Sequence, residues 1–347
     1  MSRRGIISLI TLFLLLLVIF TARQEIAHAI KLISHVNLWI LALLIPLQFI
    51  VYFAAGEMMF EYLRSKHALK HTPRITLTRM ALELNFVNHI LPSGGVSGIS
   101  YMGWRLGKFG VSPGRATMSQ AVRYVTGFLS YLTLLIISVI LITLDSGVNR
   151  FIILVSSVLA SAIVFGMIFG VYIISSSDRL TGFARWLTRH VNRFVKIVTF
   201  GKTKRALELK RVELFFTDFH NDFKELRADK RLLLKPYLWG IVFNAADVGL
   251  FVVGFLSLGY HINPAIILVS YGIASLAGFI VITPGGAGAY EALMIAFMGS
   301  AGVPPGIAIA GVLITRVILL LGTIFSGYFF YQLTILKYGK TPVKSGS

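Results

Sequence analysis

The sequence contains no cysteine, which excludes disulfide bridges, thiolate metal sites and cysteine nucleophiles. Charged residues are also scarce: they make up 14% of the 347 residues, whereas soluble domains carry roughly 25%. Acidic residues are the scarcest, with 14 Asp and Glu against 33 Lys and Arg, and the formal net charge is +19. Hydrophobic residues make up 56% of the chain. These values predict an all-α integral membrane protein, a polytopic helical bundle that forms a single domain over 1–347.

The motifs of soluble enzymes are missing as well. The sequence has no Gly-x-x-x-x-Gly-Lys-Ser/Thr loop, no His-Glu-x-x-His motif and no Gly-x-Ser-x-Gly elbow, and its histidines show no metal-ligand spacing. We therefore expect no enzyme activity, no cofactor and no metal. The basic residues flank apolar segments rather than forming a soluble basic domain, so we expect them to contact anionic membrane lipids and not nucleic acid.

Six apolar segments are long enough to cross the roughly 30 Å of hydrocarbon in a bilayer. They lie near 6–22, 38–60, 120–144, 151–175, 237–260 and 306–335. The first resembles a signal peptide, but the spans that follow favour an uncleaved helix. Cations precede the first span and follow the last one. The positive-inside rule then predicts a protein of the cell membrane with both termini in the cytoplasm.

Two further apolar stretches, about 76–110 and 265–302, are each interrupted by a Pro/Gly-rich break, at 92–98 and 284–288. Each unpaired backbone N–H or C=O in hydrocarbon costs several kcal/mol, so such breaks are tolerated only where protein or water surrounds them. In transporters, breaks at corresponding places in two halves indicate the substrate site.

The charge pattern predicts that the two broken segments enter the membrane from opposite sides. The first has cations before and after it, so both of its ends should be cytoplasmic. The second begins after the short turn 260–263 and ends at 302–305, before a span that runs inward. The order span, hairpin, span thus occurs at about 38–144 and again, inverted, at about 237–335. An alternative is that each hairpin consists of two tilted, kinked spans.

The one long polar segment, 176–235, holds 15 Lys or Arg and 7 Asp or Glu, an excess of eight positive charges. Its first part has helical apolar periodicity with a basic opposite face, typical of a helix at the cytoplasmic interface. Its second part has an apolar seam with spacings of three and four residues. That seam is expected to pack on the neighbouring helix or on a protein partner.

Polar side chains inside apolar segments are costly and therefore candidates for function. They are Glu83, Asn85, Asn88, His89, Arg123, Asn244, Asp247, Thr283, Glu291 and Arg316. Arg316 should lie about 15 Å below the outer end of its span, at a depth similar to that of Glu291. We expect the planar donor fork of Arg316 to bind a lipid phosphate, with Glu291 neutralising the empty site or taking up a proton. A purely structural ion pair is the alternative.

Arg123 is the corresponding cation in the first half, although its position near the start of its span also lets it reach the interface. The glycines of the two breaks have a further possible role, because a helix that follows them presents free N–H groups to an anion. They are Gly94, Gly95, Gly98, Gly285, Gly286 and Gly288. Close helix packing is the alternative explanation for these glycines.

The segments 88–92 and 284–291, followed by Arg316, resemble the lysylphosphatidylglycerol synthase transmembrane family, whose members are flippase-like. The resemblance spans nearly the whole chain. It implies a stand-alone relative of the N-terminal membrane half of the multiple peptide resistance factor, without the aminoacyl-transferase domain. Family members often carry an arginine and a Gly-Glu pair in the first hairpin, and the stretch 93–98 here has neither.

The residues and the resemblance together predict a protein that binds or translocates an anionic or phosphate-bearing lipid. The sequence leaves two other functions open. One is a membrane scaffold for a lipid-modifying or glycan-assembling enzyme, with the basic loop as its docking surface. The other is an intramembrane enzyme that acts through Glu83 and His89.

Overall fold

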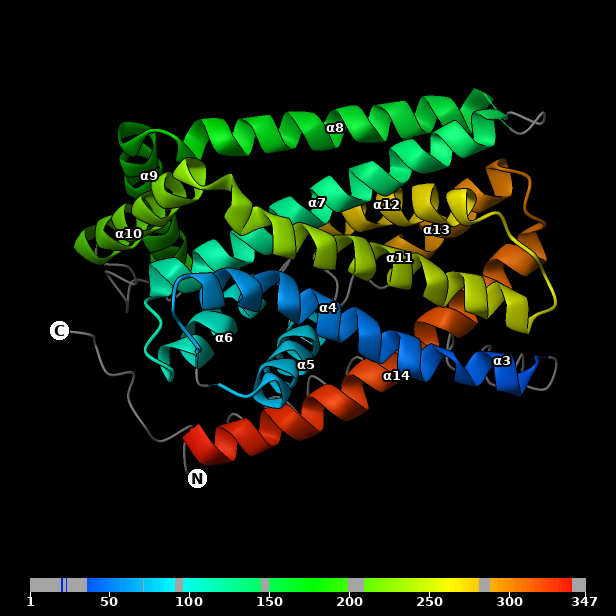
Figure 1. Ribbon diagram of the computed structural model, residues 1–347, viewed down its shortest axis with the longest axis horizontal. Helices are drawn as coiled ribbons and strands as arrows, with labels where there is room; N and C mark the ends of the chain where they lie inside the picture. Colours follow the sequence, from blue (N-terminus) through cyan, green and yellow to red (C-terminus); the bar gives the residue numbers. More distant parts are fainter. Residues whose placement is uncertain are drawn as a thin grey trace.

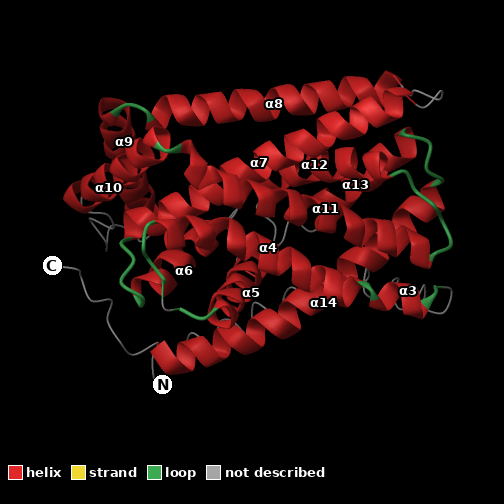
Figure 2. Cartoon of the chain, in the orientation of Figure 1, coloured by secondary structure: helices red, strands yellow, loops and turns green. Residues whose placement is uncertain are grey.

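The computed structural model describes residues 36–70, 72–90, 96–144, 150–198, 209–280 and 288–338, together with Phe20 and Arg23. Every regular element in these ranges is a helix, as Figure 2 shows. Five of these helical stretches are long and apolar enough to cross a membrane: Leu38–Ser65, Pro113–Ile140, Arg150–Ile174, Lys230–Ser257 and Pro305–Tyr338. The predicted all-α membrane fold is therefore confirmed. The predicted span at 6–22 lies outside the described residues.

The long helices run along the longest axis of the molecule (Figure 1). They are α3 (Leu38–Ala42) with α4 (Leu44–Ser65), α7 (Pro113–Leu144), α8 (Arg150–Ile174), α11 (Leu234–Ser257) and α14 (Pro305–Tyr338). Apolar side chains point outward from them: Phe165 on α8 and Phe325 on α14 are each 73% exposed. Exposed aromatic rings of this kind suit a helix surrounded by acyl chains.

Two pairs of shorter helices form the predicted hairpins. The first pair is α5 (Arg74–Ile90) and α6 (Val96–Gly107), and the second is α12 (Pro264–Ile280) and α13 (Ala289–Ser300). In both pairs the first helix has 17 residues and the second has 12. Twelve residues extend only about 18 Å, which is too short to cross the hydrocarbon core. The lengths thus fit re-entrant hairpins better than pairs of full spans.

The hairpins open toward opposite ends of the bundle (Figure 1). The α5–α6 pair opens toward the end that carries α9 (Ser177–Val198) and α10 (Leu209–Ala228), and the α12–α13 pair opens toward the other end. Each hairpin packs on the long helix that follows it and on the long helix of the other half: α7 contacts α6 and α12, and α14 contacts α13 and α5. Each of the long helices α7 and α14 therefore packs against both hairpins.

The same type of turn connects each hairpin to the long helix that follows it, from α6 to α7 and from α13 to α14. The sequence Gly-x-x-Gly-Val-x-Pro-Gly occurs at 107–114 and again at 299–306. In each copy the second glycine has a positive φ, +77° and +93°, a conformation that glycine adopts without strain. The following valine is buried and donates its N–H to the carbonyl five residues earlier, from Val111 to Leu106 and from Val303 to Met298. Such a turn ends one helix and starts the next in a fixed direction.

Small residues allow the central helix α11 to approach its neighbours closely. Gly240 lies against Ser130 and the Thr126 carbonyl of α7, and Gly254 lies against Thr315 of α14. The amide of Asn244 donates to the Gly127 carbonyl at 3.1 Å and to the Ser130 hydroxyl at 2.9 Å. Inside a bilayer the hydrophobic effect does not drive helices together, because the lipid tails are apolar too. Helices there associate through close backbone packing and interhelical hydrogen bonds.

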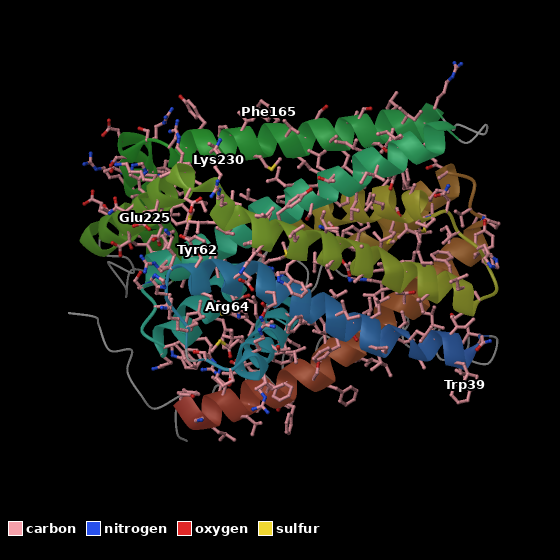
Figure 3. The ribbon with its side chains drawn as sticks, viewed as in Figure 1. Trp39, Tyr62, Arg64, Phe165, Glu225 and Lys230 are labelled. Atoms are coloured by element: carbon pink, nitrogen blue, oxygen red, sulfur yellow. The ribbon has the colours of Figure 1, made fainter. Side chains whose placement is uncertain are left out.

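The helices α9 and α10 form a cap that we call the basic end. Phe183 of α9 contacts Phe216 of α10 edge to face, and Arg185 pairs with Glu213 at 3.5 Å. Along α10, Phe219 and Leu226 are buried in the core. The apolar seam predicted for this segment therefore packs on the neighbouring helix and on the bundle. Figure 3 shows Glu225 and Lys230 at this end and Trp39 at the opposite end.

Two ion pairs attach α10 to the spans. Arg115 pairs with Asp222 at 3.2 Å, and Lys66 pairs with Glu225 at 2.6 Å. Burial raises the pKa of Asp222 above its ordinary value although Arg115 opposes the shift. The hydrogen bond and charge of Lys66 hold the pKa of the exposed Glu225 below its ordinary value. The cap is thus fixed to the start of α7 and to the end of α4.

Candidate functional site

The ion pair predicted from the sequence forms between the second hairpin and α14. The Nε of Arg316 donates to Oε1 of Glu291 at 2.8 Å, and Glu291 is 8% exposed. The other carboxylate oxygen accepts the backbone N–H of Gly288 at 2.7 Å, at the first turn of α13. Gly288 has φ +86°, which is why glycine suits this position. Glu291 therefore caps its own helix and neutralises Arg316.

A chain of aromatic and hydroxyl groups extends from Arg316 across the neighbouring helices. The guanidinium lies 4.1 Å from the centroid of the Tyr290 ring. Tyr290 and Tyr271 both hydrogen-bond to Ser275, and Tyr271 also hydrogen-bonds to Asp247 of α11. This chain links α14, α13, α12 and α11, so it holds the Arg316 side chain in one orientation.

Arg316 and Arg123 line one cavity of about 300 Å³ in the middle of the bundle. The cavity wall also contains Met58, Tyr124, Gly127, Phe128, Tyr131, Ile163, Phe243, Asn244, Tyr271, Gly272, Ser275, Leu276 and Tyr290. Arg123 lies ten residues after Pro113, the first residue of α7, and Arg316 lies eleven residues after Pro305, the first residue of α14. The long helix of each half thus contributes one arginine to the same space.

The two arginines differ in their electrostatic environment. Arg316 is paired with Glu291. Arg123 is half-buried, and within the part of the chain that the structure describes its guanidinium has no hydrogen bond and no ion pair. The ring of Tyr124 lies 6.0 Å from it. A half-buried guanidinium without a counter-ion attracts an anion such as a phosphate.

An apolar crevice of about 670 Å³ adjoins this cavity. It lies mainly between α7 and α8, and it shares Tyr124, Phe128, Ile163 and Leu276 with the wall of the cavity. Gly166 and Gly170 of α8 line it, and open space lies next to both glycines. Arg227 and Lys230 line it too, and Figure 3 shows Lys230 at the basic end. A chamber that contains two arginines and continues into an apolar crevice matches the shape of an amphiphile.

The sequence is similar to that of a known family of membrane proteins. Residues 5–327 match the family model for the lysylphosphatidylglycerol synthase transmembrane region. The chain belongs to this family. It is also similar to a UPF0104 membrane protein of Methanothermobacter thermautotrophicus, with 25% identity over 239 residues that cover 67% of each chain. No solved structure is significantly similar to it. The resemblance inferred from the sequence is confirmed, and the family name connects the protein with membrane lipids.

In this family member the remaining predicted site residues have different surroundings. Asn88 lies where α5 and α6 cross, with its amide against Gly98, and it does not line the cavity. Its neighbour His89 is close enough to Arg316 to be affected by the arginine's charge. The N–H of Gly288 is used by Glu291, so this glycine does not offer a free donor to a ligand. The other predicted site residues, Thr283, Gly94, Gly95, Gly285 and Gly286, lie outside the described residues.

The two residues proposed for an intramembrane enzyme do not meet. Glu83 accepts hydrogen bonds from Tyr101, Arg105 and Thr334, whereas the Nδ1–H of His89 donates to the carbonyl of Asn85. Among the described residues, no group of three His, Asp or Glu side chains gathers to hold a metal ion. Sequence reasoning missed the Arg105 partner of Glu83 and the entire apolar crevice.

Proposed function

We propose that this protein binds a phosphate-bearing membrane lipid and moves its head group across the bilayer, as a transporter and not as an enzyme. The observation that carries the proposal is the junction of the arginine-lined cavity with the apolar crevice. Arg123 and Arg316 would hold the phosphate, and the crevice between α7 and α8 would hold an acyl chain. Membership of a family named for a lipid synthase's membrane region supports the same substrate class.

The opposed hairpins supply the element that such transport needs. In transporters built from inverted repeats, rocking of one repeat against the other exposes a fixed central site alternately to the two sides. Here each long helix contacts both hairpins, so a tilt of one half changes access to the cavity from either end. We propose that the repeats span about 38–144 and 237–335, that the protein lies in the cell membrane, and that the basic end and both termini face the cytoplasm.

The crevice offers the most specific test of this proposal. In the double variant Gly166→Leu/Gly170→Leu, two leucine side chains would occupy the space intended for the acyl chain. We expect the rate of lipid translocation to fall about tenfold, which corresponds to an activation free energy that is higher by about 1.4 kcal/mol. Folding should be preserved, since open space lies next to both glycines. The assay is dithionite quenching of fluorescently labelled phosphatidylglycerol in liposomes that contain the purified protein.

The matched control is Phe165→Leu, one residue before Gly166. Phe165 is 73% exposed and points away from the bundle on the outer side of α8 (Figure 3). This variant should translocate lipid at the wild-type rate. If the double glycine variant is folded and equally fast, an acyl chain does not use the crevice, and the proposed route is wrong.

A further inference from the structure

A second polar cavity, of about 430 Å³, lies between the first hairpin and the last turns of α14. Its wall includes Arg79, Glu83, Arg105, Thr334, Lys337 and Tyr338. It shares no wall residue with the central cavity, so it is a separate space. The first helix of one hairpin and the long helix of the other half meet around it.

The centre of this cavity is a buried arginine whose donors are only partly used. Arg105 is 4% exposed, and its Nε donates to Glu83 at 3.2 Å. In the described part of the chain its Nη1 has no hydrogen-bond partner. Two aromatic rings lie close to the guanidinium: the ring centroids of Tyr338 and Phe109 are 4.7 Å and 5.3 Å from its Cζ. Leaving a buried donor of a charged group without an acceptor costs its desolvation free energy. A ligand that supplies an acceptor would therefore be stabilised at this site.

Glu83 does not supply that acceptor, because its carboxylate is already occupied. One oxygen accepts from the Tyr101 hydroxyl at 2.6 Å and from Arg105, and the other accepts from the Thr334 hydroxyl at 2.6 Å. Glu83 is 1% exposed, and among the described residues Arg105 is the cation within salt-bridge distance of it. Its hydrogen bonds orient Arg105 and leave the remaining donor for a ligand.

Two further cations stand at the rim. Arg79 and Lys337 are exposed, and each contacts a ring, Phe330 at 5.3 Å and Tyr338 at 5.3 Å. The wall therefore carries three cationic side chains and one carboxylate, which leaves two positive charges in excess. A phosphate monoester carries about two negative charges at neutral pH, whereas a phosphodiester carries one.

We infer that this cavity is a second anion site and that it binds a dianionic phosphate monoester group, with Arg105 as the buried donor and Arg79 and Lys337 at its mouth. The group comes either from a lipid head group such as that of phosphatidic acid or from a soluble phosphate. The inference does not depend on the proposed function, because no residue of the central cavity takes part in it.

The test measures binding of radiolabelled inorganic phosphate to the full-length protein in detergent at pH 8. We expect saturable binding of one phosphate per chain. In the variant Arg79→Gln/Lys337→Gln the affinity should fall about tenfold, because two charges that attract the dianion are lost. This variant keeps the buried Glu83–Arg105 pair and should therefore fold normally. The control Arg189→Gln/Lys224→Gln removes two exposed cations of the basic end and should bind like the wild type.

A second variant and a competition measurement with lipids complete the experiment. Glu83→Gln/Arg105→Gln removes the central donor without leaving a buried charge unpaired, and it should abolish binding. In nanodiscs, competition by phosphatidic acid but not by phosphatidylglycerol identifies a lipid as the source, and absence of competition identifies a soluble phosphate. The inference is overturned if neither phosphate nor phosphatidic acid binds the wild type, or if Arg79→Gln/Lys337→Gln binds as tightly as the wild type.

Discussion

Arg316→Gln is expected to slow translocation of labelled phosphatidylglycerol in liposomes by at least about tenfold. A hydrogen bond to a charged group contributes about 1.5–3 kcal/mol, and most of that is lost when the guanidinium that holds the phosphate is removed. The same substitution leaves Glu291 buried without its partner, which typically costs 3–5 kcal/mol of stability. Loss of transport in the single variant is therefore ambiguous, and a second variant is needed.

Arg316→Gln/Glu291→Gln separates the two explanations. The double variant removes both charges and leaves no buried carboxylate unpaired. Its thermal unfolding temperature in detergent should therefore be higher than that of Arg316→Gln and closer to the wild-type value. If Arg316 binds lipid, translocation stays at least about tenfold slower even though the fold is restored. If the pair is only structural, stability and transport recover together, and Arg316 is not a binding residue. Arg185→Gln/Glu213→Gln, which removes an exposed pair on the cap, is the matched control and should leave both properties unchanged.

Arg123→Gln should weaken transport about tenfold and leave the unfolding temperature unchanged or higher. The reason is the contrast with Arg316: in the described part of the chain Arg123 has no ion-pair partner, so its removal leaves no buried carboxylate behind. A half-buried cation without a counter-ion also destabilises the empty protein. The liposome assay and thermal unfolding measure the two effects separately.

Arg123→Lys refines the same experiment. Lysine keeps the charge but loses the planar donor fork, so we expect a rate between those of the wild type and Arg123→Gln. Wild-type transport in Arg123→Gln would show that the unpaired arginine faces the cavity without binding the substrate.

The spans were predictable from sequence because a helix that crosses hydrocarbon needs an apolar run of fixed length, and hydropathy registers that run directly. The hairpins were predictable for two reasons. A Pro/Gly break interrupts a continuous helix, and positive charges on both sides of 76–110 place both ends of that segment on the same side of the membrane. The ion pair of Arg316 and Glu291 followed from helix geometry alone, since one residue's depth in its span could be matched to the other's.

Some features were present in the sequence but were not used. The Gly-x-x-Gly-Val-x-Pro-Gly turn at 107–114 and 299–306 marks the repeat more clearly than the breaks do. The helices α4 and α11 carry a similar signal, since 44–57 and 234–247 share Leu-x-Pro and, further on, Phe-x-Ala-x followed by an acidic residue. Aligning the two halves would have found both, at an offset of 192 residues for the turn and 190 residues for the helices.

Other features could not be predicted, because they depend on how distant helices pack. The crevice exists because α7 and α8 are separated beside Gly166 and Gly170. The sequence does not show whether a glycine packs closely against a neighbouring helix or borders an open space. The pairing of Glu83 with Arg105 and Thr334 joins three helices. The sequence named Arg123 as the cation of the first half, but it could not decide between the cavity and the interface, because that depends on the rotation of α7.

The proposed transport requires that the cavity enclosed by the two halves holds a lipid phosphate between Arg123 and Arg316. Native mass spectrometry of the protein purified in mild detergent tests it most directly, because it reports bound lipid without an assumed substrate. We predict one phosphate-bearing lipid on the wild type and on Arg185→Gln/Glu213→Gln, and strongly reduced occupancy on Arg123→Gln and on Arg316→Gln/Glu291→Gln. Equal occupancy by the same lipid on all four proteins would contradict the claim.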